Sequence, residues 1–268
     1  MKDEILRLIK MEQGQPCDLL FNDLALRLYR HQYDHNLPYH RFSDLQHQNP
    51  ETVKRWEAIP ALPVTAFKHA DIACRPMNEA VRLFYSSGTT QAQRSHHALF
   101  DLEISRAAIL LHFKRHLLPD TDQIRFMILT PSPNDAPNAS LSYMMEAVRE
   151  AYGTAASRYY VEQGQLQSER VAMDMAKTEE PVCLLGTSFS FVHLIDFCRE
   201  RGFTHLLPPG SRLMDTGGFK GRSREVSQEW IYARAEQDWG IPPGNCINEY
   251  GMAEMSSQFY DRIVGKTA

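Results

Sequence analysis

The protein has 268 residues, enough for one or two domains, with 43% hydrophobic and 23% charged residues, as in ordinary globular proteins. The formal net charge is −4 and no basic block stands out, which argues against nucleic acid as the main partner. No apolar run approaches membrane-spanning length, and the first residues lack the apolar core of a signal peptide, so we expect a cytoplasmic protein. The five cysteines are scattered without a CxxC pair, which argues against a disulfide framework or a structural zinc site.

Apolar residues recur at helical spacing over about 3–35, which predicts two helices separated by a break at 14–16. The stretch 36–80 is rich in Pro, Asn and His and is predicted to be an irregular connection. We therefore expect residues 1–80 to form a helical N-terminal extension followed by a connection.

From about residue 81 the sequence alternates between short apolar runs and helical patterns. The expected strands are 81–85, 126–129, a short one near Tyr159, 182–186, 212–214 and 246–248. The expected helices are about 100–117, one capped by Asn138 and ending near 151, 164–177, one capped by Thr187 or Ser188 and ending before Gly202, and 223–239. This order predicts an α/β fold, with a mainly parallel, layered sheet flanked by helices over residues 81–268. Ligands of such sheets bind at the carboxyl ends of the strands.

The first motif is the loop Ser86-Ser87-Gly88-Thr89-Thr90, which follows an apolar run. Its small residues allow backbone N–H groups and hydroxyls to turn toward one anion. The loop lacks the spacing of a Walker motif, and Arg94 and Ser95 follow it, where Arg94 can add a charge-assisted contact. The alternative is a polar connection between a strand and a helix.

The second motif is Asn248-Glu249-Tyr250-Gly251-Met252-Ala253-Glu254. Its aromatic ring can stack on a purine, and its carboxylate can hold Mg²⁺. Together with the hydroxyl-rich loop, it predicts a site for a nucleoside triphosphate.

A third segment, Gly186-Thr187-Ser188-Phe189-Ser190-Phe191, presents small donors beside large rings. It can place a substrate carboxylate next to an apolar acyl tunnel, with Gly186, Thr187, Ser188 and Phe191 as the binding residues. The alternative is a helix N-cap followed by core aromatics. His193 is interpreted as a packing residue, and Cys183, Cys198 and Cys246 as small buried hydrophobes.

These motifs resemble those of the adenylate-forming superfamily, which contains acyl-CoA synthetases, peptide-synthetase adenylation domains and luciferases. Residues 86–90 match the superfamily's phosphate motif [ST]-[ST]-G-[TS]-[TS]-G-x-P-K, from which Gln91, Gln93 and Arg94 depart. The segment 250–254 resembles Y-G-x-T-E, with Ala253 in place of Thr, and Asp215-Thr216-Gly217-Gly218 resembles the G-G turn of the adenine pocket.

The resemblance implies ATP and Mg²⁺ as cofactors and assigns roles to individual residues. Tyr250 is expected to stack on adenine, Glu254 to bind Mg²⁺, and Arg94 and Glu254 to act in catalysis. The ATP-binding set that it implies is Ser86, Ser87, Gly88, Thr89, Thr90, Ser95, Gly217, Gly218, Glu249, Tyr250, Gly251 and Met252.

Within the superfamily, the sequence resembles the LuxE-type acyl-protein synthetases over roughly residues 55–261. The shared features are the proline-flanked F-K of residues 63–68, the pair Ser95-His96, and E-Y-G-M-[TA]-E followed by S-S-Q-F-Y at 256–260. Such enzymes activate a fatty acid as an acyl-adenylate and pass the acyl group to a protein thiol. Phenylacetate-CoA ligases share these motifs, so coenzyme A is an alternative acceptor, and a non-catalytic ligand-binding or partner subunit is a further alternative.

Members of the superfamily continue past these motifs with an Asp that binds the ribose, a hinge and a mobile domain that carries a catalytic Lys. LuxE-type proteins also keep an acylated Cys near their C-terminus. This sequence ends seven residues after Asp261. We therefore expect it to correspond to the N-terminal part of the enzyme, to have reduced activity alone, and to work with a partner that carries the remaining domain.

Overall fold

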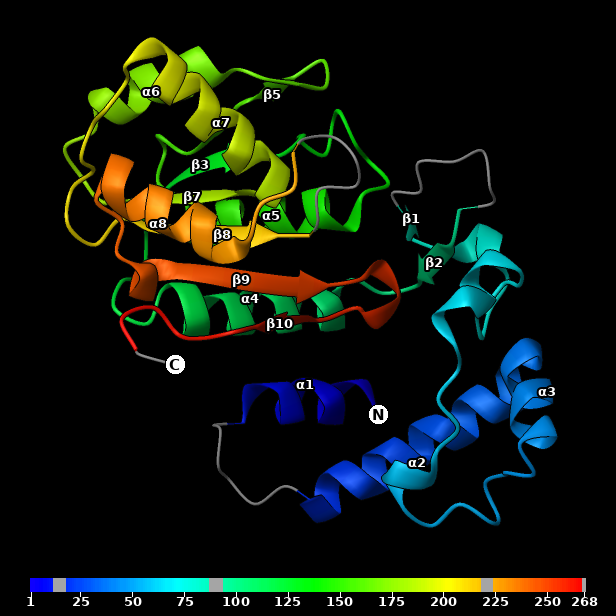
Figure 1. The fold of residues 1–268 in the computed structure, drawn as a ribbon. Helices are drawn as coiled ribbons and strands as arrows, with labels where there is room; N and C mark the ends of the chain where they lie inside the picture. The colour runs from blue at the N-terminus through cyan, green and yellow to red at the C-terminus, as the bar shows by residue number, and fades with distance from the viewer. Residues whose placement is uncertain (12–17, 87–93, 218–223, 267–268) are drawn as a thin grey trace. The chain divides into compact units, whose positions relative to one another are not determined.

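The computed structural model describes residues 1–11, 18–86, 94–217 and 224–266 (Figure 1). The chain forms two compact units, Met1–Ala108 and Ile109–Ala268, and each is described by itself. Of the predicted site, Ser87, Gly88, Thr89, Thr90 and Gly218 lie outside the described residues.

The first unit begins with three helices. The two helices predicted over 3–35 are present as α1 (Lys2–Lys10) and α2 (Asp18–His35). A third helix, α3 (Leu37–Leu45), lies within the stretch that was expected to be irregular. Asn36 starts this helix, because its side chain accepts a hydrogen bond from the Tyr39 amide at 3.3 Å, and proline stands in the first turn. Tyr29, Tyr39 and Val53 form the small core of this region.

Three short 3₁₀ helices and a β-hairpin complete the first unit. The 3₁₀ helices are η1 (Trp56–Ala58), η2 (Val64–Lys68) and η3 (Met77–Glu79). The predicted strand is β1 (Arg82–Tyr85), and it pairs antiparallel with β2 (His96–Leu99), which the sequence did not predict because its two histidines hide the strand pattern. The following helix, α4 (Glu103–Leu117), begins near the expected position.

The second unit is built on a six-stranded sheet with the order β10-β9-β8-β7-β3-β4. Its strands are β3 (Arg125–Leu129), β4 (Arg158–Tyr159), β7 (Val182–Thr187), β8 (Arg212–Thr216), β9 (Cys246–Gly251) and β10 (Gln258–Tyr260). All neighbouring strands from β4 to β9 are parallel, and β10 alone in this sheet runs antiparallel, as a return of the chain beside β9. The prediction of a mainly parallel α/β sheet is therefore confirmed.

Helices cover both faces of this sheet (Figure 1). One core cluster lies under α6 (Ser168–Ala176), α7 (Ser188–Arg201) and α8 (Gln228–Trp239). The other lies under α4 and α5 (Ser140–Tyr152). Successive residues of β7 alternate between the clusters, with Val182 and Leu184 in the first and Cys183 and Leu185 in the second. Burial on both faces explains why these strands read as continuous apolar runs. A small hairpin, β5 (Val161–Glu162) and β6 (Gln165–Leu166), was not predicted.

The helix boundaries correct two sequence expectations. Helix α5 has Ala139 rather than Asn138 at its N-cap, and no side chain caps it. Helix α8 begins at Gln228 rather than near 223, because Ser227 accepts a hydrogen bond from the Trp230 amide and fixes the first turn there. The expected cap of α7 is confirmed, since Thr187 and Ser190 form a reciprocal capping box and Gly202 ends the helix in a left-handed conformation.

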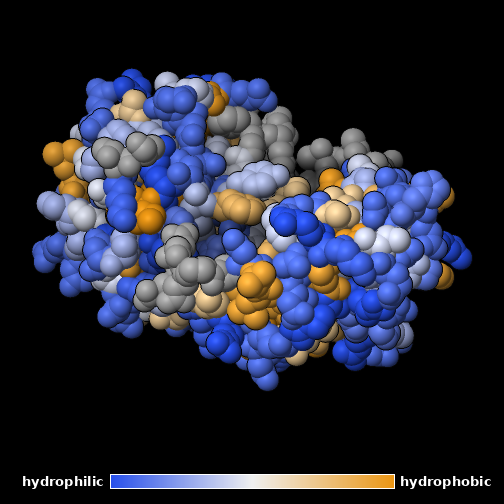
Figure 2. Space-filling view, turned by 90° about the horizontal axis from the view of Figure 1, so that it is seen from below, coloured by the Kyte–Doolittle hydropathy of each residue, from blue (hydrophilic) through white to orange (hydrophobic). Residues whose placement is uncertain are grey.

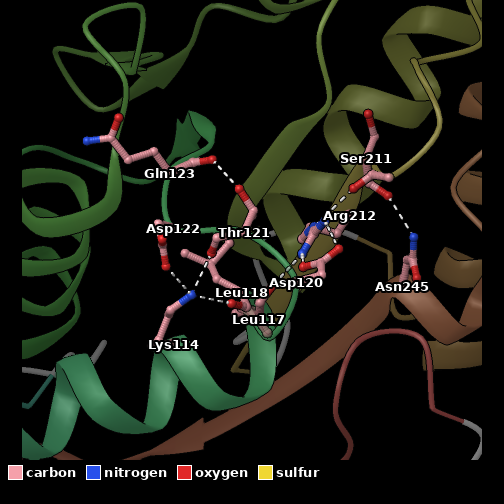
Figure 3. Close-up of polar contacts among 11 residues, drawn as sticks. Lys114, Leu117, Leu118, Asp120, Thr121, Asp122, Gln123, Ser211, Arg212 and Asn245 are labelled. Atoms are coloured by element: carbon pink, nitrogen blue, oxygen red, sulfur yellow. Dashed lines mark hydrogen bonds and ion pairs between the residues drawn. The ribbon is translucent and has the colours of Figure 1, made fainter.

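A polar cluster anchors the amino end of β8 to the end of α4 (Figure 3). The buried Arg212 guanidinium donates to both carboxylate oxygens of Asp120, at 2.7 and 3.0 Å, and to the Leu117 carbonyl at 2.7 Å. Lys114 donates to the carbonyls of Leu118 and Thr121 at 2.8 and 2.7 Å. These cations satisfy carbonyl groups that follow the last turn of α4, and they complement the helix dipole.

The surface carries hydrophobic residues only in small separate groups on the face drawn in Figure 2. No helix in the described ranges of the chain is long and apolar enough to cross a membrane.

Candidate active site

The described ends of the hydroxyl-rich loop close the β1–β2 hairpin in the first unit. The Ser86 amide donates to the Ser95 carbonyl at 2.9 Å, and the Ser95 amide donates to the Ser86 hydroxyl at 3.1 Å. Ser95 is buried, whereas Arg94 is exposed. The loop is thus held at its base, and it connects two strands rather than a strand and a helix.

The neighbouring residues of the first unit support this hairpin. The ring of Phe67, from the proline-flanked segment, packs edge-on against His97 of β2, with ring centroids 5.6 Å apart. His96 lies 2.7 Å from an Asp71 carboxylate oxygen. Both histidines of the pair therefore have structural neighbours within this unit.

In the second unit, three of the predicted segments end adjacent parallel strands. Residues 186–188 span the end of β7 and the first residue of α7, Gly217 follows β8, and Tyr250 lies near the end of β9. Because β7, β8 and β9 are neighbours with the same direction, these segments meet at the carboxyl edge of the sheet. The expectation that they converge is confirmed for this unit.

The segment of residues 186–191 is tightly packed. A Cβ added to Gly186 would lie 3.1 Å from the Phe191 ring and 3.2 Å from Leu129, so a larger residue would require these side chains to shift by a few tenths of an ångström. Phe191 is fully buried in the core, and Thr187 caps α7. Phe191 therefore packs as a core aromatic, as the alternative interpretation expected, while Ser188 at the helix start is 6% exposed.

The turn after β8 has an open, left-handed glycine. Gly217 has φ of +71°, a conformation that L side chains rarely adopt, and an added Cβ would meet no atom within 4 Å. The turn lies beside the end of β9. Its role in an adenine pocket stays a prediction.

A buried carboxylate, Asp215, connects these segments. Tyr232 of α8 donates to its Oδ1 at 2.7 Å, and Ser188 and Asn248 donate to its Oδ2 at 2.9 and 3.2 Å. Asp215 is 1% exposed, and burial raises its pKa although these hydrogen bonds oppose the rise. Asp215 was noted in the sequence only as part of the glycine turn, and no role was predicted for it. An Asp that directly follows the apolar pair Leu213-Met214 of a buried strand is the signal that identifies it.

The aromatic of the second motif is accessible. Tyr250 is 56% exposed, its hydroxyl lies 3.8 Å from the Met252 sulfur, and Phe259 of β10 stands opposite it across the strand pair. Phe259 is also exposed, so two rings lie on one face of the ribbon beyond the last buried residues. An exposed ring at the carboxyl edge of a parallel sheet can stack on a planar base.

Glu249 differs from its neighbour Tyr250, because it points into the protein. It is 4% exposed and accepts a hydrogen bond from the Thr216 hydroxyl. Burial, with a contribution from nearby Asp215, raises the pKa of Glu249 to about 7. A Cβ on Gly251 would lie 2.5 Å from Glu249 Oε1, so the glycine of the motif leaves room for this carboxyl group. Direct contact of Glu249 with ATP stays a prediction.

Glu254 lies in the short 3₁₀ helix η5 (Ala253–Met255) and is partly exposed. No group of three or more His, Cys, Asp or Glu residues capable of holding a metal occurs within the described ranges. Mg²⁺ is commonly held by one or two carboxylates together with substrate phosphates, so a single accessible Glu fits that arrangement.

The structure corrects the interpretation of His193 and confirms that of three cysteines. His193 is exposed and contacts Phe189 edge-on, so it is not a core packing residue as expected. It lies on the outer face of α7, three residues after the buried Ser190. Cys183, Cys198 and Cys246 are buried, and burial raises the pKa of each thiol, which confirms that they pack as small hydrophobes.

No curated protein sequence matches the chain. Among solved structures, it is similar to a long-chain-fatty-acid-CoA ligase from Archaeoglobus fulgidus, with 14% identity and a TM-score of 0.44. That match covers 66% of this chain and 32% of the ligase, so the chain spans about a third of its length. The family model "Acyl-protein synthetase, LuxE" matches residues 9–253. The chain therefore belongs to the LuxE acyl-protein synthetase family.

Proposed function

We propose that this protein activates a fatty acid with ATP and Mg²⁺ as an acyl-adenylate and transfers the acyl group to a protein thiol. The observation that carries the proposal is the family match over residues 9–253. The carboxyl edge of the sheet supports it, because an exposed ring, an open glycine turn and an accessible carboxylate lie on adjacent segments there.

The proposed reaction has two steps. A carboxylate oxygen of the acid attacks the α-phosphorus of ATP, and the bond to pyrophosphate breaks. A thiolate then attacks the acyl carbon, and AMP leaves with the electron pair of the carbon–oxygen bond. The acid needs no general base, since a carboxylic acid is already ionised at neutral pH.

The residues of this chain would bind and orient the reactants. Tyr250 would stack on adenine, and the Gly217 turn would line the base, as in the assigned ATP-binding set. Glu254 would hold Mg²⁺, which neutralises the charge that develops on the phosphates. Binding of the phosphate chain by the loop at 86–90 and Arg94 stays a prediction from the sequence resemblance.

Residues 186–188 would place the carboxylate of the acid. Ser188 is the first residue of α7, where helix N–H groups favour an anion. The buried apolar layer beneath this point, which contains Phe191, would define where the hydrocarbon chain begins.

We include a cytoplasmic location in the proposal, because the described cysteines are free thiols.

Calorimetric titration tests the nucleotide part of the proposal. The probes are ATP and an acyl sulfamoyl adenosine with a long alkanoyl chain, which mimics the acyl-adenylate and resists hydrolysis. We expect the mimic to bind more tightly than ATP, because it fills both subsites. Failure of the folded protein to bind either probe would overturn the proposed function.

The acyl acceptor requires product analysis with a labelled fatty acid. Label on a protein thiol, released by hydroxylamine, is the expected result. Label on coenzyme A when coenzyme A is supplied would identify a CoA ligase of the phenylacetate type instead. A ligand-binding subunit would bind the mimic tightly but release no pyrophosphate from ATP and the fatty acid, even with a candidate partner added.

A further inference from the structure

We propose that Asp215 is a positioning residue that holds three segments in one fixed arrangement. They are the acid segment (residues 186–188), the glycine turn (Gly217) and the adenine segment (residues 248–250). This inference rests on the proposed function, because it concerns how two subsites of that function are aligned. The observation behind it is the set of hydrogen bonds that joins Ser188, Tyr232 and Asn248 to one buried carboxylate.

The three donors come from three different elements. Ser188 is the first residue of α7 and belongs to the proposed acid subsite, whereas Asn248 of β9 stands two residues before Tyr250. Tyr232 lies on α8, which covers the same face of the sheet. A shift of any of these elements would break a hydrogen bond to a group that water does not reach, which makes separate movement unfavourable.

Ser188 extends the connection to the glycine turn. Its hydroxyl oxygen lies 2.9 Å from Asp215 Oδ2 and 2.8 Å from the Gly217 carbonyl. The carboxylate and the turn therefore share the same hydroxyl group. Asn248 adds a second connection, since its amide also lies 3.4 Å from the Asp215 carbonyl in the neighbouring strand.

The donors are themselves fixed. The Gln228 amide donates to the Tyr232 hydroxyl at 2.7 Å, so the Tyr232 hydroxyl hydrogen is directed toward Asp215. The Asn248 backbone amide donates to Asp261 at 2.8 Å, which fixes β9 at this residue. A carboxylate surrounded by pre-oriented donors suits a supporting role, because it holds binding groups without touching the ligand.

The consequence for binding is specific. A ligand that occupies only the adenine subsite needs one correctly placed segment, whereas a ligand that spans both subsites needs the correct distance between them. Loss of the Asp215 contacts should therefore weaken a spanning ligand more than a ligand that fills the nucleotide part alone.

Two probes isolate this effect, namely sulfamoyl adenosine and the same molecule carrying a long alkanoyl chain. The dissociation constant of sulfamoyl adenosine divided by that of the alkanoyl derivative gives the affinity that the acyl part adds. The principal variant is Tyr232→Phe, which removes one donor and keeps the ring in place. The second variant is Asp215→Asn, which keeps the side-chain volume but places an amide against the donors of Ser188 and Asn248.

The chain offers a matched control, Tyr160→Phe. Tyr160 is a fully buried tyrosine whose hydroxyl also donates to an aspartate, Asp174, at 2.7 Å, and it follows β4 at the opposite edge of the sheet. Both phenylalanine variants lose the same kind of hydrogen bond, so both should lower the melting temperature. Only Tyr232→Phe should change the ratio of the two dissociation constants.

We expect Tyr232→Phe to reduce the ratio by roughly five- to tenfold, the loss that corresponds to one hydrogen bond, and Asp215→Asn to reduce it at least as much. Affinity for sulfamoyl adenosine alone should change by less than about threefold. An unchanged ratio in folded Tyr232→Phe, or an equal drop in Tyr160→Phe, would overturn the inference. If the wild-type protein binds neither probe, the proposed function fails, and the inference fails with it.

Discussion

The Arg212 guanidinium and the Asp120 carboxylate form a two-pronged ion pair, with N–O distances of 2.7 and 3.0 Å, at the amino end of β8. The two partners differ in exposure, because the Arg212 side chain is 3% exposed and the Asp120 side chain 55%. Burial of the cation makes it dependent on its acceptors, which include the carbonyl of Leu117, the last residue of α4. The pair therefore joins a central strand to the end of a covering helix.

Arg212→Ala should destabilise the protein by roughly 2–3 kcal/mol. The loss is smaller than that from breaking a fully buried ion pair, because Asp120 is half exposed. Arg212→Lys should recover part of this loss, since it restores the charge but not the planar fork. Arg224→Ala is the matched control, because Arg224 makes a similar two-pronged contact with Asp196 on the surface. This variant should lose less than about 1 kcal/mol of stability. Urea unfolding measures all three variants. Equal losses for Arg212→Ala and Arg224→Ala would contradict this account.

Tyr250→Ala should weaken ATP binding by about 1–3 kcal/mol, by analogy with stacking on nucleic-acid bases. Tyr250→Phe keeps the ring and loses only the hydroxyl contact to Met252, so its affinity should stay within about threefold of wild type. Calorimetric titration with ATP gives both values. Because Tyr250 is 56% exposed, neither variant should shift the melting temperature much. A similar loss of affinity in both variants would exclude stacking as the role of the ring.

Glu254→Gln should reduce the rate of acyl-adenylate formation more than the affinity for ATP, because the Mg²⁺ bound by a carboxylate stabilises the charge that moves in the reaction. Single-turnover pyrophosphate release and equilibrium titration separate the two quantities. Glu225→Gln is a suitable control, since Glu225 is an exposed carboxylate of the same unit. A large loss of thermal stability in ligand-free Glu254→Gln would instead assign this carboxylate a structural role.

Glu249→Gln should change how stability depends on pH. The pKa of Glu249 is about 7 in the folded protein and ordinarily 4.5, so between these pH values the folded state holds a proton that the unfolded state has released. Stability from this group is therefore present at low pH and falls as pH rises through that window. The variant cannot ionise at this position and lacks this loss. Its free energy of unfolding, relative to that of wild type, should therefore rise by roughly 2–4 kcal/mol between pH 5 and pH 8.

Glu146→Gln is the control with the opposite sign. The Glu146 carboxylate accepts hydrogen bonds from Arg149, which hold its pKa below the usual range. Its stabilising effect is present above the unfolded pKa and is lost as pH falls, so this variant should be less stable than wild type at pH 8 and similar to it in acid. Urea unfolding at several pH values tests both variants. Parallel curves for wild type and Glu249→Gln would show that Glu249 ionises normally.

The parallel sheet could be predicted from the sequence because strands buried on both faces must be apolar throughout. The runs that became β3 and β7 carry this signal, whereas β2 begins with two histidines and β10 has only three residues. Helix α3 was missed because its Asn36 cap and early proline were read as loop residues. Local composition does not separate a helix start from a turn when both use the same residues.

The site was only partly predictable for a different reason. Sequence motifs identify which residues gather at the strand ends, but they do not tell which side of the strand each one occupies. Glu249 and Tyr250 are neighbours in one motif, yet one is buried beside Thr216 and the other is exposed. The tertiary partners of Asp215 come from positions 188, 232 and 248, and no local pattern connects them.

Strand β8 carries Arg212 at its first residue and Asp215 three residues later, on opposite faces of the sheet. Stabilising substitutions around Arg212 would therefore raise the tolerance of the chain to further change while leaving the Asp215 neighbourhood untouched. Under the proposed function, directed evolution toward acids of other lengths would begin from such a background, with diversity introduced only around residues 186–188.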